Sequence, residues 1–445
     1  MQKSRVKRVG ALLVGLTLVA AACGSDDDDD ATPSTDAPAV TDAPDEGGDE
    51  GEGEGEGEAA GDGSCESDGV LTVGTILPVT GDLAFLGPPE IAGAELAVED
   101  INAAGGVLGA DVILEQGDSG DTTTDTANLE VDRLLAAGAD VIVGAASSAV
   151  SKTVIDKITT SCVIQFSPAN TSPDFTTYDD NGLYFRTAPS DLLQGRVLAN
   201  LVLEDGAESA SVLYRQESYG VGLAEAFQDN FTGSGGTIDE FLAYAVDTES
   251  FDAEIDALVE AGSDAIVVIG FAESASILTT MNERGIGPAD VAVYGVDGNL
   301  GIESEMSDPS ILEGMKFTTP SVDLESISDF IARLDGQGDM GGVYAYGAET
   351  YDAIIITALA AEIAGTDDPS AIAAEINGVT KDGEKCFTFE ECKALIEAGT
   401  DIDYDGLGGP YEFVDAGEPA AASFRIALYG PEGPAEGADV YVFAS

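Results

Sequence analysis

Residues 134–154 read LLAAGADVIVGAASSAVSKTV, and residues 258–278 read LVEAGSDAIVVIGFAESASIL. Each stretch contains the end of a helical pattern, an Ala-Gly step, an aspartate, a short apolar strand pattern, a glycine, and small or hydroxyl residues that begin another helix. Such α/β units can resemble one another by chance, but a repeat of this kind also indicates two lobes built on the same plan.

The same rhythm extends along the chain from residue 70. Strand patterns occupy residues 70–77, 111–118, 140–144 and 162–167, and helical patterns occupy residues 89–104, 126–138 and 151–161 between them. This alternation predicts an α/β fold with parallel sheets flanked by helices on both faces. In such sheets ligands bind at the carboxyl ends of the strands, so two facing lobes would form a cleft lined by the loops that follow the strands.

These loops carry the candidate binding residues. The first half of the chain contributes a Gly/Pro-rich turn and the segments AASSAVS and SPANTSP, and the second half contributes YRQESYG, IGFAES and YGVDGN. The candidates are Leu86, Ser147, Ser148, Ala169, Asn170, Thr171, Tyr219, Phe271 and Asp297.

Three interpretations are open for Ser147 and Ser148. A catalytic nucleophile would lack a histidine partner, and Lys152 would have to lose its proton in an acidic protein, which raises the pKa of a lysine. A plain helix N-cap would need only one serine. An anion site would use the hydroxyls together with the free N–H groups of the helix start.

The other loops favour the anion site. SPANTSP adds hydroxyl and backbone donors from the same lobe, and Asp297 supplies a carboxylate from the other lobe. This arrangement suits a small zwitterion whose carboxylate lies at the helix start and whose ammonium lies at Asp297, because buried charges need partners. Phe271, Tyr219 and Leu86 would cover the apolar remainder, although such residues more often serve only in packing.

The chain is strongly acidic and contains no histidine. It has 84 acidic and 17 basic residues, which give a formal net charge of −67. A surface of this charge repels nucleic acid and anionic lipid headgroups and suits a salty medium. The lack of histidine excludes Ser-His and Cys-His nucleophile pairs and His-ligated metal sites. We therefore expect no enzyme activity, no metal and no cofactor.

The N-terminal segment is typical of an exported lipoprotein. Residues 1–22 combine a basic run, an apolar core too short to span a bilayer and a small-residue cleavage site, so cleavage would leave Cys23 to carry the lipid. Ordinary secretion with an unmodified Cys23 is the alternative. Residues 23–64 contain DDDDD and GEGEGEGE and predict an acidic, disordered tether. We expect a protein anchored by lipid to the outer face of the cell membrane.

Four further cysteines predict two disulfides in an exported chain. Cys386 and Cys392 lie close together in CFTFEEC and are expected to bridge locally. That pairing leaves Cys65 with Cys162, provided that the first strand lies near the strand containing Cys162. Zinc binding by the four cysteines is the alternative, but no pair has CxxC spacing.

As an ordered set, these motifs resemble the substrate-binding lipoproteins of branched-chain amino-acid ABC transporters, the Leu/Ile/Val-binding type. The resemblance covers Val70 to about Tyr429, through ILPVTGDLAFLG, ELAVEDINAAGGVLG, VGAASSAVS, SPANTSPDFT, FRTAPSDLLQG, YGVGLAEAF and GVDGN. It implies two Rossmann-like lobes joined by a three-crossover hinge, the type I periplasmic-binding-protein fold. Lobe I would comprise residues 65–188 and 319–415, and lobe II residues 189–318 and 416–445.

The resemblance also implies roles for single residues. Ser148, with the segment of Ala169 and Thr171, would hold the α-amino-acid group of a ligand, Asp297 would contact its ammonium, and Tyr219 and Phe271 would help to enclose it. FRTAPSD, KFTTPS and the stretch around residues 411–428 would lie at the three crossings. Three positions depart from the family pattern: Leu86 replaces a frequent aromatic residue, Asp297 is shorter than the usual glutamate, and Phe271 lacks the hydroxyl of a tyrosine.

The implied function is that of a monomeric receptor that captures an amino acid, branched-chain or similar, and delivers it to ABC permease subunits in the membrane. Relatives of this fold also bind urea, short amides and small organic acids, so such a ligand is one alternative. A ligand sensor that docks to a signalling partner is another.

Overall fold

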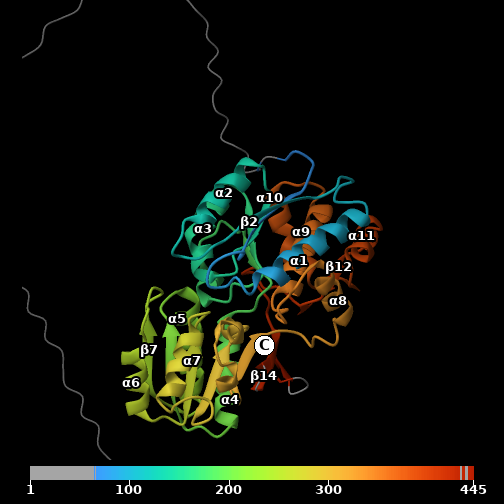
Figure 1. Cartoon of the computed structure of the whole chain (residues 1–445). Coiled ribbons are helices and arrows are strands. Elements are labelled where there is room, and N and C mark those ends of the chain that lie inside the picture. The colour runs from blue at the N-terminus through green and yellow to red at the C-terminus, as the bar shows by residue number, and fades with distance from the viewer. Residues whose placement is uncertain (1–64, 66, 431–432, 436–438) are drawn as a thin grey trace, which may run out of the picture. The chain divides into compact units, whose positions relative to one another are not determined.

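The computed structural model describes residues 65, 67–430, 433–435 and 439–445, which Figure 1 draws in colour. The expected signal segment 1–22, the expected lipid site Cys23 and the expected tether 23–64 lie outside the described residues. Two large sheets organise the described chain, and the units built on them are called here the first lobe and the second lobe.

The first lobe is built on a five-stranded parallel sheet. Its elements are β1 (Thr72–Leu77), α1 (Gly87–Ala103), β2 (Ile113–Asp118), α2 (Thr126–Ala136), β3 (Val141–Gly144), α3 (Ser148–Thr160), β4 (Ile164–Ser167), the 3-10 helix η1 (Pro173–Thr177) and β5 (Tyr184–Arg186). The strand order is β2-β1-β3-β4-β5. Helices α2 and α3 pack on one face and α1 on the other, so β1, β3 and β4 are buried throughout (Figure 1).

The second lobe has a larger sheet with the same alternation. Its elements are α4 (Asp191–Glu204), β6 (Ser209–Arg215), α5 (Ser218–Gly233), β7 (Thr237–Tyr244), α6 (Asp252–Ala261), β8 (Ala265–Ile269), α7 (Ser274–Glu283), β9 (Ala292–Val296), η2 (Asp297–Asn299), η3 (Ile302–Glu305), η4 (Pro309–Leu312), β10 (Lys316–Pro320), β14 (Ala422–Gly430), β15 (Gly433–Pro434) and β16 (Val440–Ala444). Helices α4 and α5 cover one face, and α6 and α7 cover the other. Both halves of the sequence repeat thus form a helix, a strand and a helix, as predicted.

The predicted parallel sheets are present in both lobes, and the second lobe adds antiparallel strands at one edge of its sheet. Strands β6 to β10 are parallel, but β14 runs antiparallel to β10, and β15 and β16 run antiparallel to β14. The chain enters β14 directly from the first lobe. Antiparallel neighbours need no crossover helix, so the sequence contains no helix pattern that predicts β14, β15 and β16.

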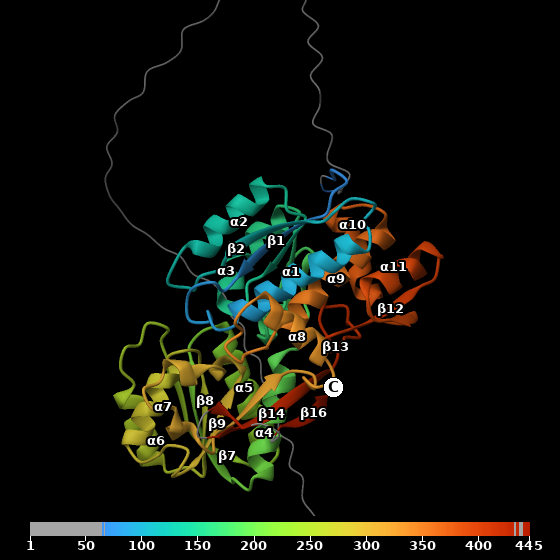
Figure 2. The same cartoon turned by 45° about the vertical axis from the view of Figure 1, so that its right-hand side comes forward.

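The segment between β10 and β14 returns to the first lobe. It contains α8 (Ser328–Gln337), α9 (Gly347–Ala364), α10 (Pro369–Val379), β11 (Glu384–Cys386), α11 (Phe389–Glu397), β12 (Ile402–Gly406) and β13 (Gly409–Pro410). Figure 2 shows α9 beside α1, and residues of both helices belong to one buried core. Helix α9 is apolar on nearly all sides because protein surrounds it. Within the described ranges, no helix combines the length and apolar character needed to cross a membrane.

The structure contains both expected disulfides, Cys65–Cys162 and Cys386–Cys392. The first bridge joins the segment before β1 to the end of α3. The carboxylate of Asp367 reinforces this corner, because its Oδ2 accepts hydrogen bonds from the backbone N–H groups of Asp68, Gly69 and Val70. The second bridge closes a short loop at the start of α11.

The chain passes between the lobes three times, and a small cavity lies beside the three crossings. Thr187 lines it from the first crossing, Pro320 from the second and Ala421 from the third. Glu349, in the first turn of α9, also lines this cavity and is 7% exposed. Burial raises the pKa of Glu349 to about 8, because the carboxylate would lose its hydration.

We expect the stability of the wild type to fall more steeply with rising pH than that of Glu349→Gln. The folded pKa lies above the ordinary value of 4.5, so the folded state holds an extra proton between pH 4.5 and about pH 8. Stability from this group is full below that window and is lost as the pH rises through it. Across the window the wild type should lose up to about 5 kcal/mol more than the variant in urea unfolding. Parallel pH profiles of the two proteins would contradict this.

Candidate ligand-binding site

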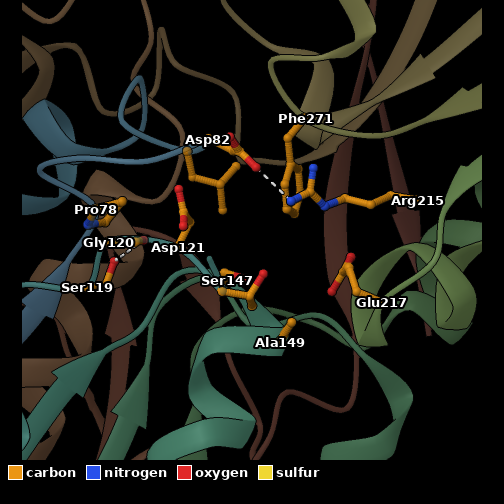
Figure 3. A pocket seen from close by; sticks show the side chains of 12 residues that line it. Pro78, Asp82, Ser119, Gly120, Asp121, Ser147, Ala149, Arg215, Glu217 and Phe271 are labelled. Atoms are coloured by element: carbon orange, nitrogen blue, oxygen red, sulfur yellow. Dashed lines mark hydrogen bonds and ion pairs between the residues drawn. The ribbon is translucent and has the colours of Figure 1, made fainter. Parts of the chain in front are cut away.

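A small cavity between the two lobes brings together most of the predicted binding residues. Its walls are the loops that follow β1, β3 and β4 of the first lobe and β6, β8 and β9 of the second. An adjoining pocket shares Leu83, Ser147 and Phe271 with it (Figure 3). The predicted residues that line the cavity are Leu86, Ser147, Ser148, Ala169, Tyr219, Phe271 and Asp297.

The first lobe directs the N-terminus of α3 toward this cavity. Ser147 is the N-cap, and its Oγ accepts a hydrogen bond from the N–H of Val150 at 3.4 Å. The N–H groups of Ser148 and Ala149 have no acceptor in the part of the chain that the structure describes. The segment therefore combines an ordinary helix cap with free donors at the positive end of a helix, which suit a bound anion.

Gly144 allows the tight turn from β3 into α3. Its φ is +114°, and a side chain at this position would collide with the carbonyl oxygen of Ile76 on neighbouring β1. The glycine in VGAASS is thus required by the close approach of two strands. It places Ser147 and Ser148 at the carboxyl edge of the sheet.

The second lobe contributes the carboxylate of Asp297, directly after β9. The residue is 6% exposed. Its Oδ1 accepts from the Tyr219 hydroxyl and from the Gln194 Nε2, both at 2.9 Å, and its Oδ2 accepts from the Tyr346 hydroxyl at 2.8 Å. Tyr346 precedes α9 of the first lobe, so this last bond joins the two lobes.

Burial governs the protonation of these groups. It raises the pKa of Asp297, whereas the bonds from Tyr346, Gln194 and Tyr219 lower it. Burial and the charge of Asp297 raise the pKa values of Tyr219 and Tyr346 well above the ordinary value, so both phenols remain donors. An ammonium group placed beside Asp297 would favour its ionised form.

Aromatic and aliphatic side chains form the rest of the wall. The rings of Tyr219 and Phe271 are stacked with their centroids 5.3 Å apart. Leu83 and Leu86 line the cavity from the first lobe and are buried. This wall can cover an apolar group of modest size.

Two predicted residues, Asn170 and Thr171, lie outside the cavity lining and use their side chains elsewhere. The Asn170 Nδ2 donates to the carbonyls of Ala145 and Ala146 at 3.0 and 2.9 Å. The Thr171 hydroxyl donates to the Asp191 carboxylate at 3.0 Å. These bonds fix the SPANTSP loop against the turn before α3, so that Ala169 faces the cavity.

A buried arginine, Arg186, also stabilises the SPANTSP loop. The Nη1 of Arg186 donates to the carbonyls of Asn170 and Ser172 at 3.1 and 2.7 Å, and its Nε donates to Glu418 at 2.9 Å. Glu418 lies at the third crossing, shortly before β14. Arg186 thus connects the binding loop to the hinge, a role that the sequence did not reveal.

Sequence reasoning also missed Tyr346 and Gln194. Tyr346 has a φ of +63°, a costly backbone conformation for a bulky residue and one that is enriched at functional sites. Its surroundings, VYAYGAET, look like an ordinary approach to a helix. Gln194 lies within the amphipathic pattern of α4, where no local signal marks a residue that reaches another loop.

Within the described residues, the hydroxyls of Ser147 and Ser148 form no hydrogen bond with a side chain that could act as a base. Lys152 pairs instead with Asp174. Within the described residues, no group of His, Cys, Asp and Glu side chains is arranged to hold a metal ion.

Two α/β lobes that enclose a small cavity, with donors on one side and a carboxylate on the other, define a solute-binding receptor. A family model described as periplasmic binding protein matches residues 70–429, and the chain belongs to this family. Its members are receptors that act outside the cytoplasm and are not enzymes. The predicted two-lobed fold is thereby confirmed.

Individual proteins of the family resemble the chain over most of its length. It is 27% identical over 365 residues to the chemotactic signal transduction system substrate-binding protein BasB of Halobacterium salinarum, covering 78% of this chain and 84% of that protein. It is 27% identical over 308 residues to Leu/Ile/Val-binding protein homolog 3 of Brucella melitensis, covering 68% and 82%. A solved structure of LivJ, a branched-chain amino acid transporter substrate binding protein of Streptococcus pneumoniae in complex with isoleucine, matches with a TM-score of 0.69 at 20% identity, over 84% of this chain and 99% of that chain.

Proposed function

We propose that the protein captures an α-amino acid, branched-chain or similar, between its lobes and delivers it to the permease of an ABC importer. The observation that carries this proposal is the opposition of charge across one cavity. Free N–H groups of α3 face it from the first lobe, and the buried carboxylate of Asp297 faces it from the second. The ligand carboxylate would bind at Ser147 and Ser148, and its ammonium at Asp297.

The remaining wall supports a small apolar side chain on the ligand. Leu86, Ala169, Tyr219 and Phe271 provide apolar surface around the place where this group would lie. Burial of such a group is favourable by about 25 cal/mol per Å². The relatives named for binding Leu, Ile and Val, and the LivJ complex with isoleucine, support the same ligand class.

The proposal includes the place of the protein in the cell. Residues 1–22 would be removed on export, Cys23 would carry the lipid, and residues 23–64 would form the tether of a monomeric receptor. The proposed lobes comprise residues 65–188 with 319–415 and residues 189–318 with 416–445. Closure of these lobes on the ligand would present the surface that the permease recognises.

A sensing role is the second candidate, because BasB is described as part of a chemotactic signal transduction system. The two roles differ in what is lost when the gene is deleted. Loss of labelled amino-acid uptake with intact taxis supports import, and loss of taxis with intact uptake supports sensing.

A thermal-shift screen tests the ligand class. The purified chain, in high salt, is tested against the amino acids, urea, short amides and small organic acids. A ligand at 100 times its dissociation constant should stabilise the protein by about 2.7 kcal/mol. We expect the largest shift with isoleucine, leucine or valine. A shift with amides or organic acids alone would contradict the assignment of Asp297 to an ammonium.

A further inference from the structure

The second lobe presents a continuous row of side chains that runs from Asp297 to Arg215. Tyr219 donates to Asp297 and stacks on Phe271. The guanidinium of Arg215 lies 4.8 Å from the centroid of the Phe271 ring, and Figure 3 shows these two side chains. Arg215 lies at the end of β6 and forms an ion pair with Glu273, with 2.9 Å between its Nη1 and the Oε1 of Glu273. The row connects the ligand cavity with the adjoining pocket.

The first lobe contacts this row at both ends. At the inner end Tyr346 donates to Asp297, as described above. At the outer end Asp82, in the turn after β1, lies 2.6 Å from the Nη2 of Arg215. Leu83, the next residue, lines the ligand cavity. The Asp82–Arg215 ion pair therefore joins the lobes directly beside the cavity.

The surroundings of this ion pair make it reversible. The Asp82 side chain is 37% exposed, so its carboxylate returns to water when the lobes separate. The Arg215 side chain is 3% exposed but keeps Glu273 and the Phe271 ring as partners. Opening thus leaves no unpaired buried charge, and the ion pair favours closure without locking it.

Ser218 makes the neighbouring hydrogen bonds between the lobes. Its hydroxyl lies 2.8 Å from the Ser172 hydroxyl and 3.1 Å from the Asp174 carboxylate. Lys152 already neutralises Asp174. Asp82 and Arg215 instead form a bond between two charged groups, which is the stronger kind.

We propose that the Asp82–Arg215 ion pair is a latch that holds the lobes closed and sets the rate of ligand release. This inference rests on the proposed function, because it requires a ligand that the lobes enclose. Neither residue lines the ligand cavity, so both are positioning residues that act through closure.

The release rate of isoleucine tests the latch. Asp82→Asn removes the charge and keeps the shape, and we expect about ten-fold faster release, the size of one lost charge-assisted hydrogen bond, with an unchanged association rate. Stopped-flow tyrosine fluorescence of the full chain can follow release, because the chain has no tryptophan and Tyr219 and Tyr346 lie at the site.

Asp121 provides a matched control, because it lines the same adjoining pocket as Asp82 and Arg215. Asp121 lines it but makes no hydrogen bond or ion pair to the second lobe within the described residues, so Asp121→Asn should release isoleucine at the wild-type rate. Asp82→Glu keeps the carboxylate, so this variant should release isoleucine nearly as slowly as the wild type. Added salt should speed release from the wild type more than from Asp82→Asn, because it screens the ion pair. A purely structural role would not produce this difference.

Failure of the latch and failure of the proposed function give different results. Equal release rates from the wild type and Asp82→Asn overturn the latch even when isoleucine binds. A wild type that binds no amino acid overturns the proposed function, and the latch is then judged by small-angle X-ray scattering of the free protein. A larger radius of gyration for Asp82→Asn than for the wild type supports the latch, and equal values overturn it.

Discussion

Asp297→Asn is expected to weaken isoleucine binding by about 100-fold or more. In the wild type the proposed ammonium lies against a buried carboxylate that already accepts three hydrogen bonds. Removal of one partner of a buried charge pair costs about 2–5 kcal/mol, which corresponds to a loss of roughly 30-fold to several thousand-fold. Isothermal titration calorimetry of both proteins measures the difference.

A neighbouring carboxyl group provides the matched control for this prediction. Asp191 is buried, and burial together with the charge of Asp297 raises its pKa well above the ordinary value. Asp191 lies outside the lining of the ligand cavity, so Asp191→Asn should change isoleucine affinity only slightly. Equal losses for the two variants would indicate a general disturbance of the lobes and contradict the specific role of Asp297.

The ligand itself offers a second control. The 2-hydroxy analogue of isoleucine keeps the carboxylate and the side chain but has a hydroxyl in place of the ammonium. We expect the wild type to prefer the amino acid strongly and Asp297→Asn to bind the two compounds with similar affinity. A variant that retains the full preference would show that the ammonium binds elsewhere.

Arg186→Met is expected to lower the free energy of unfolding by about 3–5 kcal/mol. The Arg186 side chain is 1% exposed and pairs with Glu418, and it also satisfies the carbonyls of Asn170 and Ser172. Its loss leaves the carboxylate of Glu418 without its cationic partner. Urea unfolding measures the effect, with the two lobes followed separately if they unfold in separate transitions.

Two further variants separate a buried ion pair from a surface one. Adding Glu418→Gln to Arg186→Met should recover part of the loss, because the uncompensated charge is then absent. Arg284→Met breaks ion pairs with Asp252 and Asp256 at the surface, where the expected loss is below about 1 kcal/mol. Similar losses for Arg186→Met and Arg284→Met would contradict the importance of burial.

The parts of the site that follow strands could be predicted from the sequence. Ser147, Phe271 and Asp297 each come directly after a short apolar run, and parallel sheets gather such positions at one edge. The two roles predicted for Ser147, helix cap and anion site, do not exclude each other, because the residue caps α3 and also lines the cavity.

The residues that reach the site from elsewhere could not be predicted in this way. Tyr346 and Gln194 bond to Asp297 from helix starts 49 and 103 residues away in sequence, and their local patterns indicate only packing or an amphipathic helix. Asn170 shows the opposite error, a residue that was predicted to bind the ligand but does not line the cavity. Its position after β4 is that of a binding residue, but local carbonyl groups occupy its amide.

The final strands were missed for a topological reason. A helix between parallel strands gives a long and recognisable pattern, whereas β14 and β16 are antiparallel neighbours, which need no such helix. The charge of −67 was informative about partners but not about the fold, since a surface charge is compatible with many folds.

The bridge between Cys65 and Cys162 determines which part of the folded protein would receive a force applied through the proposed tether, residues 23–64. Without it, tension would arrive at the first residues of β1 and peel a central strand away from its two neighbours. With the bridge, the force is transmitted through Cys162 to the end of α3. A pull by the proposed tether would therefore leave β1 paired with β2 and β3.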